Sequence, residues 1–198
     1  WDENIIVSAG ASAVFGHESY IPSPGDEVII IEPYFPLYEL ITDLFKGIHK
    51  YARLHKVHND SLDIDMEEIV ALCNEKTKYI ILNSPQNPTG KILDERHFEA
   101  IWQLTRKYPK LVIISDEVYE RLMYTDRPLP RIASYKDMWD RTISIYSAGK
   151  TYSCTGWRIG YAIGPERLIA PLKEIQRITN NQTHGTLMNV IGLSLIQN

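Results

Sequence analysis

The segment Thr142-Ile-Ser-Ile-Tyr-Ser-Ala-Gly-Lys-Thr-Tyr-Ser-Cys-Thr-Gly-Trp-Arg158 joins an apolar, strand-like run to a loop that carries a lysine between a serine and an arginine. On both sides of it, strand-like runs alternate with stretches of helical apolar spacing. We expect strands near residues 5–8, 28–31, 50–54, 79–83, 111–115, 142–146 and 160–164, and helices near 11–19, 35–45, 65–75, 94–108 and 165–180. This alternation predicts an α/β fold, a three-layer αβα domain whose mostly parallel, seven-stranded sheet is covered on both faces.

Lys150 has the most distinctive chemistry in the opening segment. Ser147 precedes it by three positions, and Arg158 follows it by eight. A lysine amine can form a Schiff base with an aldehyde, while a hydroxyl and a guanidinium suit a phosphate group. Pyridoxal 5'-phosphate (PLP) is an aldehyde that carries a phosphate. The segment therefore predicts a PLP site in which Lys150 is the catalytic residue.

Asp116 and Tyr119 follow the apolar strand expected near residues 111–115. A carboxylate at this place could pair with the pyridinium nitrogen of PLP and keep the ring protonated, so that the ring accepts electrons from a substrate. On its own, the segment is more often a strand that ends in a solvated acidic turn. Because Lys150 comes at the end of the following strand, we favour the cofactor interpretation.

Asn87 lies in the segment Asn83-Ser-Pro-Gln-Asn-Pro-Thr-Gly90, which follows another apolar strand. Two prolines and a terminal glycine fix a tight, rigid loop. An ordinary turn is the alternative interpretation, because Asn-Pro is common in turns. The position after a strand nevertheless places Asn87 where α/β folds bind their ligands, outside the carboxyl ends of the strands.

Two further segments also follow strands. Val7-Ser-Ala-Gly-Ala-Ser-Ala13 leads from a strand into a helix through small residues, and its bare backbone amides, with Ala11 and Ser12 among them, suit a phosphate. Phe35 follows the strand near residues 28–31, where a core aromatic is the alternative. Every candidate lies at the carboxyl end of a strand or at the helix start beyond it, which is the edge expected for a ligand site.

The chain resembles the class I/II aminotransferases of fold type I, and most of all the group of kynurenine aminotransferases, glutamine transaminase K and cysteine-conjugate β-lyases. The resemblance is carried by Gly25-Asp-Glu-Val28, Ile31-Glu-Pro-Tyr-Phe35, Ser147-Ala-Gly-Lys-Thr151 and Thr155-Gly-Trp-Arg-Ile-Gly160. It implies that Asp116 holds the ring nitrogen of PLP and that Asn87 and Tyr119 bond the ring oxygen. It also implies that the remaining cofactor-binding residues are Phe35, stacked on the ring, and Ala11, Ser12, Ser147 and Arg158, around the phosphate.

The activity implied by this resemblance is transfer of an amino group from an aromatic, glutamine-like or sulfur-containing amino acid to a 2-oxo acid. A PLP-dependent β-lyase acting on cysteine conjugates and a non-catalytic PLP-binding fragment are the alternatives. Family members are considerably longer, so we expect residues 1–198 to be the PLP-binding large domain without the N-terminal arm and the C-terminal small domain. The resemblance also implies a homodimer, with the polar stretch Arg177-Ile-Thr-Asn-Asn-Gln-Thr-His184 at the interface.

Composition limits the remaining classes. Hydrophobic residues make up 44% of the chain and charged residues 23%, as in ordinary globular domains. The net charge of −4 and the lack of a basic cluster in the sequence argue against a nucleic-acid partner, and no apolar run reaches membrane-spanning length. Two cysteines and no signal peptide favour a cytoplasmic protein, with a mitochondrial location as the alternative. No metal site is expected, because His55 and His58 lack the further ligands that a zinc site needs.

Overall fold

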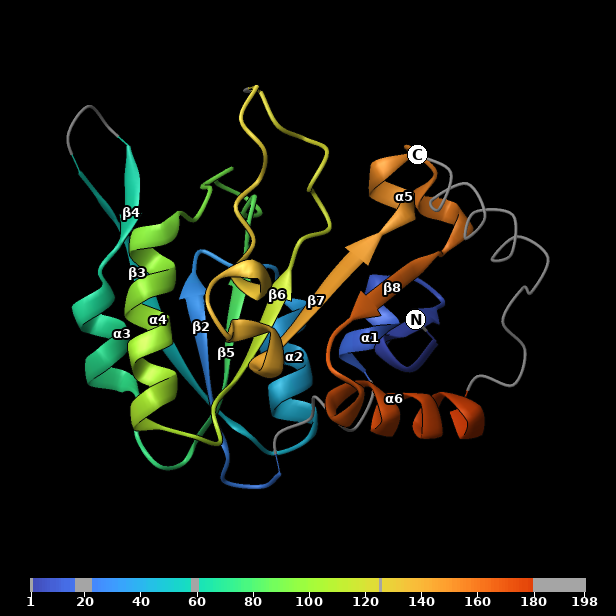
Figure 1. Ribbon diagram of the computed structural model, residues 1–198, viewed down its shortest axis with the longest axis horizontal. Helices are drawn as coiled ribbons and strands as arrows, with labels where there is room; N and C mark the ends of the chain where they lie inside the picture. Colours follow the sequence, from blue (N-terminus) through green and yellow to red (C-terminus); the bar gives the residue numbers. More distant parts are fainter. Residues whose placement is uncertain (1, 17–22, 58–60, 125, 180–198) are drawn as a thin grey trace.

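The computed structural model describes residues 2–16, 23–57, 61–124 and 126–179, which form an eight-stranded sheet with helices on both faces (Figure 1). The strand order is β1-β8-β7-β6-β5-β2-β3-β4. The neighbours from β7 to β3 pair in parallel, whereas β8 is antiparallel to both β1 and β7, and β4 is antiparallel to β3. Consequently β1, β2, β3, β5, β6 and β7 point in one direction, and β4 and β8 point in the other.

The predicted elements are all present at slightly different boundaries. The strands span Ile5–Ser8 (β1), Glu27–Glu32 (β2), Ile48–Lys56 (β3), Leu62–Ile64 (β4), Thr77–Asn83 (β5), Val112–Asp116 (β6), Thr142–Ser147 (β7) and Gly160–Ile163 (β8). The α-helices span Ala11–Phe15 (α1), Leu37–Leu44 (α2), Met66–Leu72 (α3), Glu95–Lys107 (α4), Ala148–Thr151 (α5) and Glu166–Thr179 (α6).

Three details differ from the prediction. The sheet has eight strands rather than seven, because the short strand β4 pairs with the end of β3. The helix α5 is also additional, and both elements have too few residues for a periodic pattern to show in the sequence. The first helix ends at Phe15 instead of residue 19, and residues 17–22 lie outside the described part.

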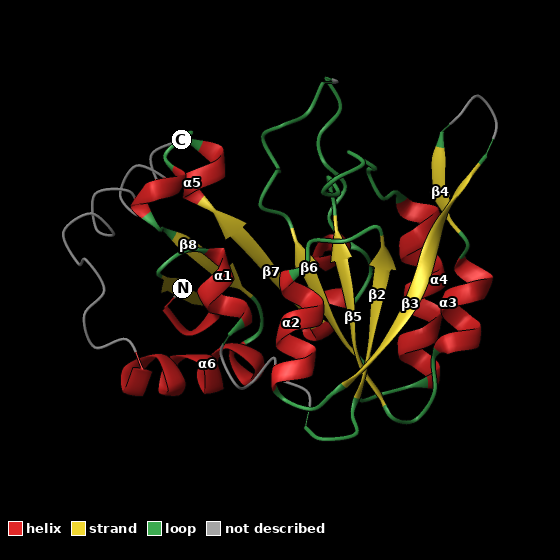
Figure 2. Ribbon diagram, turned by 180° about the vertical axis from the view of Figure 1, so that it is seen from behind, coloured by secondary structure: helices red, strands yellow, loops and turns green. Residues whose placement is uncertain are grey.

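The two faces of the sheet bury separate apolar cores. In β2, Ile29 and Ile31 pack against side chains of α3 and α4, whereas Val28 and Ile30 pack against side chains of α1, α2 and α6. Figure 2 shows α2 covering the second of these faces. The alternation of side chains along a strand explains why one apolar run serves both cores. The three-layer αβα prediction is therefore confirmed. Among the described residues, no helix has the length and apolar character needed to cross a bilayer.

The start of α4 is fixed to β4 and to the loop that follows β5. The Asp94 backbone amide donates to His97 Nδ1 over 3.1 Å, which closes a capping box at the helix N-terminus. His97 Nε2 lies 2.7 Å from Asp63 in β4, and Lys91 Nζ lies 2.8 Å from the same carboxylate. Lys91 directly follows the loop that carries Asn87. The contacts at Asp63 thus anchor the far end of that loop.

Two segments that are far apart in the sequence approach each other closely through their backbones. The turn between β1 and α1 passes directly over Gly160, the first residue of β8. A Cβ atom added at Gly160 would lie 2.2 Å from the backbone nitrogen of Ala11 and 2.4 Å from the carbonyl carbon of Gly10. Both contacts are with backbone atoms, so a side chain here would have to displace the start of α1.

We predict that Gly160→Ala lowers the free energy of unfolding by roughly 2–3 kcal/mol, because overpacking forces the backbone apart. Urea denaturation followed by circular dichroism measures this change. Gly156→Ala is the matched control, since an added Cβ there meets nothing within 4 Å. The control should change stability by less than about 0.5 kcal/mol. Equal losses in the two variants would contradict the crossing as described.

Candidate active site

A cavity of about 170 Å³ lies at the carboxyl edge of the parallel strands. The structure places all nine residues predicted from the sequence in the wall of this cavity: Ala11, Ser12, Phe35, Asn87, Asp116, Tyr119, Ser147, Lys150 and Arg158. They lie at the ends of five strands or in the segments that follow these strands, so all of them come to the same edge of the sheet. In Figure 1 this edge lies near the arrowheads of β5, β6 and β7.

Asp116 ends β6 at the floor of the cavity and is only 4% exposed. Its Oδ2 accepts a hydrogen bond from the Tyr38 hydroxyl at 2.5 Å, and its Oδ1 accepts one from the Val118 amide at 3.3 Å. Burial raises the pKa of Asp116 to about 6, against the opposing effect of these two donors. A carboxylate in this state lacks a cationic partner within the described chain. It is well suited to pair with a protonated ring nitrogen.

Tyr38 is a member of the site that the sequence analysis did not identify. It lies in α2, is 3% exposed and lines the same cavity. Its ring also packs 5.3 Å from that of Phe15 and 5.9 Å from that of Phe35, edge-on to the latter. The one signal was its place three residues after Phe35, one turn further along the same helical segment. Nothing local in the sequence distinguishes it from a core tyrosine.

Asn87 and Tyr119 meet above the carboxylate. Asn87 Nδ2 donates to the Tyr119 hydroxyl over 3.3 Å. Burial, and secondarily the charge of Asp116, raises the pKa of Tyr119, so its hydroxyl keeps its proton. Asn83, which the sequence analysis quoted without assigning a role, supports the group from below. Its Oδ1 accepts from the Asn87 amide at 2.7 Å, and its Nδ2 donates to the Asp116 carbonyl at 2.9 Å.

Lys150 stands in α5, the single turn that begins directly after β7. Its Nζ lies 5.8 Å from the centre of the Tyr119 ring. The turn packs closely against the segment at Thr155: a Cβ atom added at Gly149 would lie 2.9 Å from the Cα of Thr155. The exposed lysine side chain therefore extends over the cavity from a backbone that has little freedom.

Arg158 completes the opposite corner of the cavity. Its backbone adopts the left-handed conformation with φ 52°, and its guanidinium lies over Gly10, where an added Cβ would be 2.7 Å from Nη2. Gly10 itself has φ 90°, a value that glycine adopts readily. The guanidinium has no ion-pair partner in the described part of the chain. Its uncompensated charge stands beside Ser12 and Ser147, two hydroxyls that also line the cavity.

The cavity matches PLP in its distribution of chemical groups. A cation with two hydroxyls and the start of α1 forms one corner, which suits a phosphate. A buried carboxylate forms the floor, which suits a protonated pyridine nitrogen, and Phe15, Phe35 and Val118 supply apolar wall for the ring. Lys150 stands at the rim, where an aldehyde would have to lie. The residues present therefore fit the group, and their individual roles stay a prediction.

A second buried carboxylate directly follows Asp116. Glu117 is 2% exposed, and burial raises its pKa, against the opposing charge of Arg131. Arg131 pairs with Glu117, and the Tyr146 hydroxyl donates to the same carboxylate at 3.1 Å. Arg131 also pairs with Glu120, so it fixes both sides of the segment that carries Tyr119. An arginine thus neutralises Glu117, whereas Asp116 accepts hydrogen bonds only from uncharged donors of the described chain.

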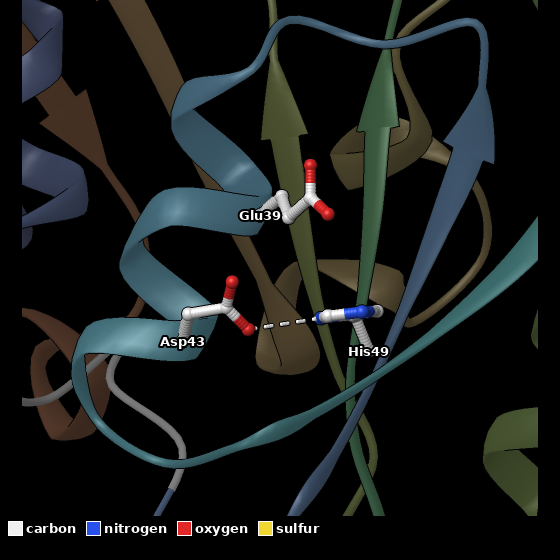
Figure 3. A group of neighbouring side chains, drawn as sticks. All are labelled: Glu39, Asp43 and His49. Atoms are coloured by element: carbon white, nitrogen blue, oxygen red, sulfur yellow. Dashed lines mark ion pairs between the residues drawn. The ribbon is translucent and has the colours of Figure 1, made fainter.

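Glu39, Asp43 and His49 form a separate group of residues with metal-binding chemistry (Figure 3). Their ligand atoms all lie within 4.8 Å of one another. His49 Nδ1 already lies 3.2 Å from Asp43, and both oxygens of Glu39 accept hydrogen bonds from tyrosine hydroxyls at 2.6 and 2.9 Å. We therefore interpret the group as a connection between α2 and β3. Of the histidine pair considered in the sequence, His55 contacts Glu68 at 3.3 Å, and His58 lies outside the described residues.

Comparison with known proteins agrees with the fold. The sequence model of the family "Aminotransferase class I and II" matches residues 2–194. Kynurenine--oxoglutarate transaminase 3 of Bos taurus is 40% identical over 186 residues, which are 90% of this chain and 41% of the relative. Kynurenine--oxoglutarate transaminase of Dictyostelium discoideum is 38% identical over 182 residues, 85% of this chain and 42% of the relative. The chain therefore spans less than half the length of these curated relatives.

Solved structures show the same architecture. N-succinyldiaminopimelate aminotransferase from Mycobacterium tuberculosis has a TM-score of 0.90 at 30% identity, over 98% of this chain and 50% of its own. The aromatic aminotransferase from Pyrococcus horikoshii has a TM-score of 0.80 at 32% identity, over 89% of this chain and 47% of its own. The family resemblance inferred from the motifs is confirmed: the chain belongs to the class I and II aminotransferases, a family that uses pyridoxal 5'-phosphate.

Proposed function

We propose that this chain binds PLP in the 170 Å³ cavity and supplies the cofactor half of an aminotransferase. The amino donor would be an aromatic, glutamine-like or sulfur-containing amino acid, and the acceptor a 2-oxo acid. One observation carries the proposal: the end of β6 and the segment between β7 and β8 bring to one cavity a buried carboxylate, a lysine, and an arginine that has no ion-pair partner in the described chain. The names of the kynurenine--oxoglutarate transaminases support the choice of substrate class.

Each residue has a role that follows from its position. When bound, the cofactor supplies a protonated ring that withdraws electrons from the reacting carbon of the substrate. Asp116 would hold the proton on the ring nitrogen, and Asn87 and Tyr119 would orient the ring through its oxygen. Arg158 and its neighbouring hydroxyls would fix the phosphate. Lys150 Nζ would carry the cofactor in the resting protein and then move the α-proton as general base and acid.

The covalent assignment of Lys150 is tested directly. Borohydride reduction of the chain with added PLP should fix the cofactor to one peptide, identified by mass spectrometry as the one that contains Lys150. Lys150→Ala should abolish both the labelled peptide and the visible absorbance band, because among the described residues Lys150 is the only lysine that lines the cavity. Lys107→Ala, which changes an exposed lysine of α4, should leave both unchanged. Labelling of a different lysine in the wild-type chain would refute the proposal.

The buried Asp116 predicts a characteristic dependence of stability on pH. Its pKa is raised to about 6 in the folded chain from 3.8, so folding favours the protonated form. The charge therefore lowers stability above the folded pKa, and the penalty disappears below the unfolded pKa. Asp116→Asn should lack this penalty. In cofactor-free protein, the stability of the variant relative to wild type should increase by roughly 2–3 kcal/mol between about pH 4 and about pH 8.

Urea denaturation at the two pH values measures this relative change, which is independent of any constant effect of replacing an oxygen by an amide nitrogen. Asp126→Asn is the control, because the Asp126 carboxylate is exposed to solvent. Its difference from wild type should stay constant within about 0.5 kcal/mol. A constant difference for Asp116→Asn as well would show that the carboxylate is not held in an apolar environment.

We also propose that the full-length protein is a homodimer that covers the mouth of this cavity. Phe35 in the cavity wall is 39% exposed, and Tyr152 and Trp157, near Lys150 and Arg158 in sequence, are 46% and 54% exposed. Exposed aromatic residues that gather in one region are typical of protein interfaces. The polar stretch predicted at the interface includes Asn181 and Gln182, which lie outside the described residues.

Trp157→Asp should convert the full-length dimer to a monomer in analytical ultracentrifugation, because a charge would be buried at the interface. Trp139→Asp is the control, since Trp139 is 39% exposed and does not line the cavity. It should leave the dimer intact. Sedimentation of the wild-type protein as a fully active monomer would exclude the assembly.

A further inference from the structure

A second, larger cavity of about 370 Å³ lies at the amino edge of the sheet, opposite the PLP cavity. Lys78 comes from the start of β5, Lys110 from the turn before β6, Arg141 from the residue before β7, and Arg167 from the first turn of α6. The sequence shows no basic cluster, because these four residues are widely separated along the chain. The parallel strands bring them together at their starts, in a chain whose net charge is −4.

No carboxylate of the described residues neutralises the four positive charges. The lining contains no carboxylate, and none of the four forms an ion pair with any residue between 2 and 179 that the structure describes. Asp140 and Glu166 are sequence neighbours of the two arginines, yet neither lines the cavity. Like charges around one cavity repel each other, so the arrangement costs stability unless an anion occupies it.

The arginines are held in place by neutral groups. Arg141 Nη1 donates to the Pro109 carbonyl, and Arg167 Nη2 donates to the Asp140 carbonyl. A carbonyl fixes a guanidinium without cancelling its charge, and each guanidinium keeps further N–H groups for a ligand. This differs from Arg131 near the PLP cavity, which is satisfied by two carboxylates. The two guanidinium groups are thus held in place to bind an anion, and their charges are not cancelled by carboxylates of the described chain.

Beside the four cations, the cavity has an apolar wall. Pro109, Leu168 and Pro171 supply its accessible surface, because the other aliphatic residues of the lining are almost fully buried. Its volume falls in the range of sites for metabolite-sized ligands. A ligand that matches both parts would carry several negative charges at one end and a compact apolar or aromatic body at the other.

We propose that this cavity binds a multivalent phosphate ester with an aromatic body, the chemistry of a nucleoside di- or triphosphate. The phosphates would contact Lys78, Lys110, Arg141 and Arg167, and the base would lie against the apolar wall. Binding here would occur at the opposite edge of the sheet from Lys150. It would therefore be compatible with occupation of the PLP cavity.

The test is isothermal titration calorimetry of the full chain with ATP in magnesium-free buffer at low ionic strength. Wild-type protein should bind, and added salt should weaken the binding because it screens the charges. The double variant Lys78→Gln/Lys110→Gln should bind at least about tenfold more weakly, since two charge-assisted contacts are removed. These lysines make no hydrogen bond or ion pair in the described structure, so the variant should keep wild-type stability.

Two controls separate this cavity from other sites. Lys46→Gln removes an exposed lysine outside the cavity and should bind ATP normally. Arg158→Gln removes the cation of the PLP cavity and should also bind normally. Adenosine, which lacks the phosphates, should not bind detectably. Absence of ATP binding, equal affinity of the double variant and wild type, loss of binding in Arg158→Gln, or adenosine binding as tight as that of ATP would each overturn the proposal.

Discussion

The common direction of six strands is the constraint on which the site depends. Asn87, Asp116 and Lys150 follow three adjacent parallel strands, so their side chains reach one edge although they are far apart in the sequence. The antiparallel strand β8 contributes to the same edge through its first residues rather than its last. Because it runs antiparallel between β1 and β7, its beginning lies where the other strands end, and Arg158 arrives at the cavity just before the strand starts. The guanidinium in the cavity wall thus comes from the turn that leads into an antiparallel strand.

Two adjacent buried carboxylates show how the chain divides structural from chemical tasks. Glu117 is paired with Arg131, which also holds Glu120, and this pairing fixes the segment after β6. Asp116 receives only a hydroxyl and an amide as donors, and burial keeps its pKa near 6. A carboxylate left without a counter-ion destabilises the fold but remains available to a cationic ligand. Stability is therefore given up at the position where the proposed chemistry needs a charge.

Much of this could be predicted from the sequence, for identifiable reasons. The strands are continuous apolar runs, and the helices between them begin with capping residues such as Asp65 and Asp94. Local motifs pointed to Asn87, Asp116, Lys150 and Arg158, which the structure brings to one cavity. Tyr38 could not be found in this way, because its significance comes from a carboxylate 78 positions away. The basic cavity was missed for the same reason, since each of its four cations is unremarkable among its sequence neighbours.

The close approach of Gly160 to the turn before α1 affects the order in which parts of the structure can form during synthesis. The strand β8 pairs residues 160–163 with residues 5–8, so the turn before α1 gains its partner only when almost the whole described chain is available. Contacts between distant segments form late, because the loop between them must first be closed. A nascent chain that ends before β8 contains Gly10 and Arg158, but it lacks the pairing of β1 with β8 that fixes the turn at Gly10. The corner where we propose that the phosphate binds can therefore form only after β8 has paired with β1.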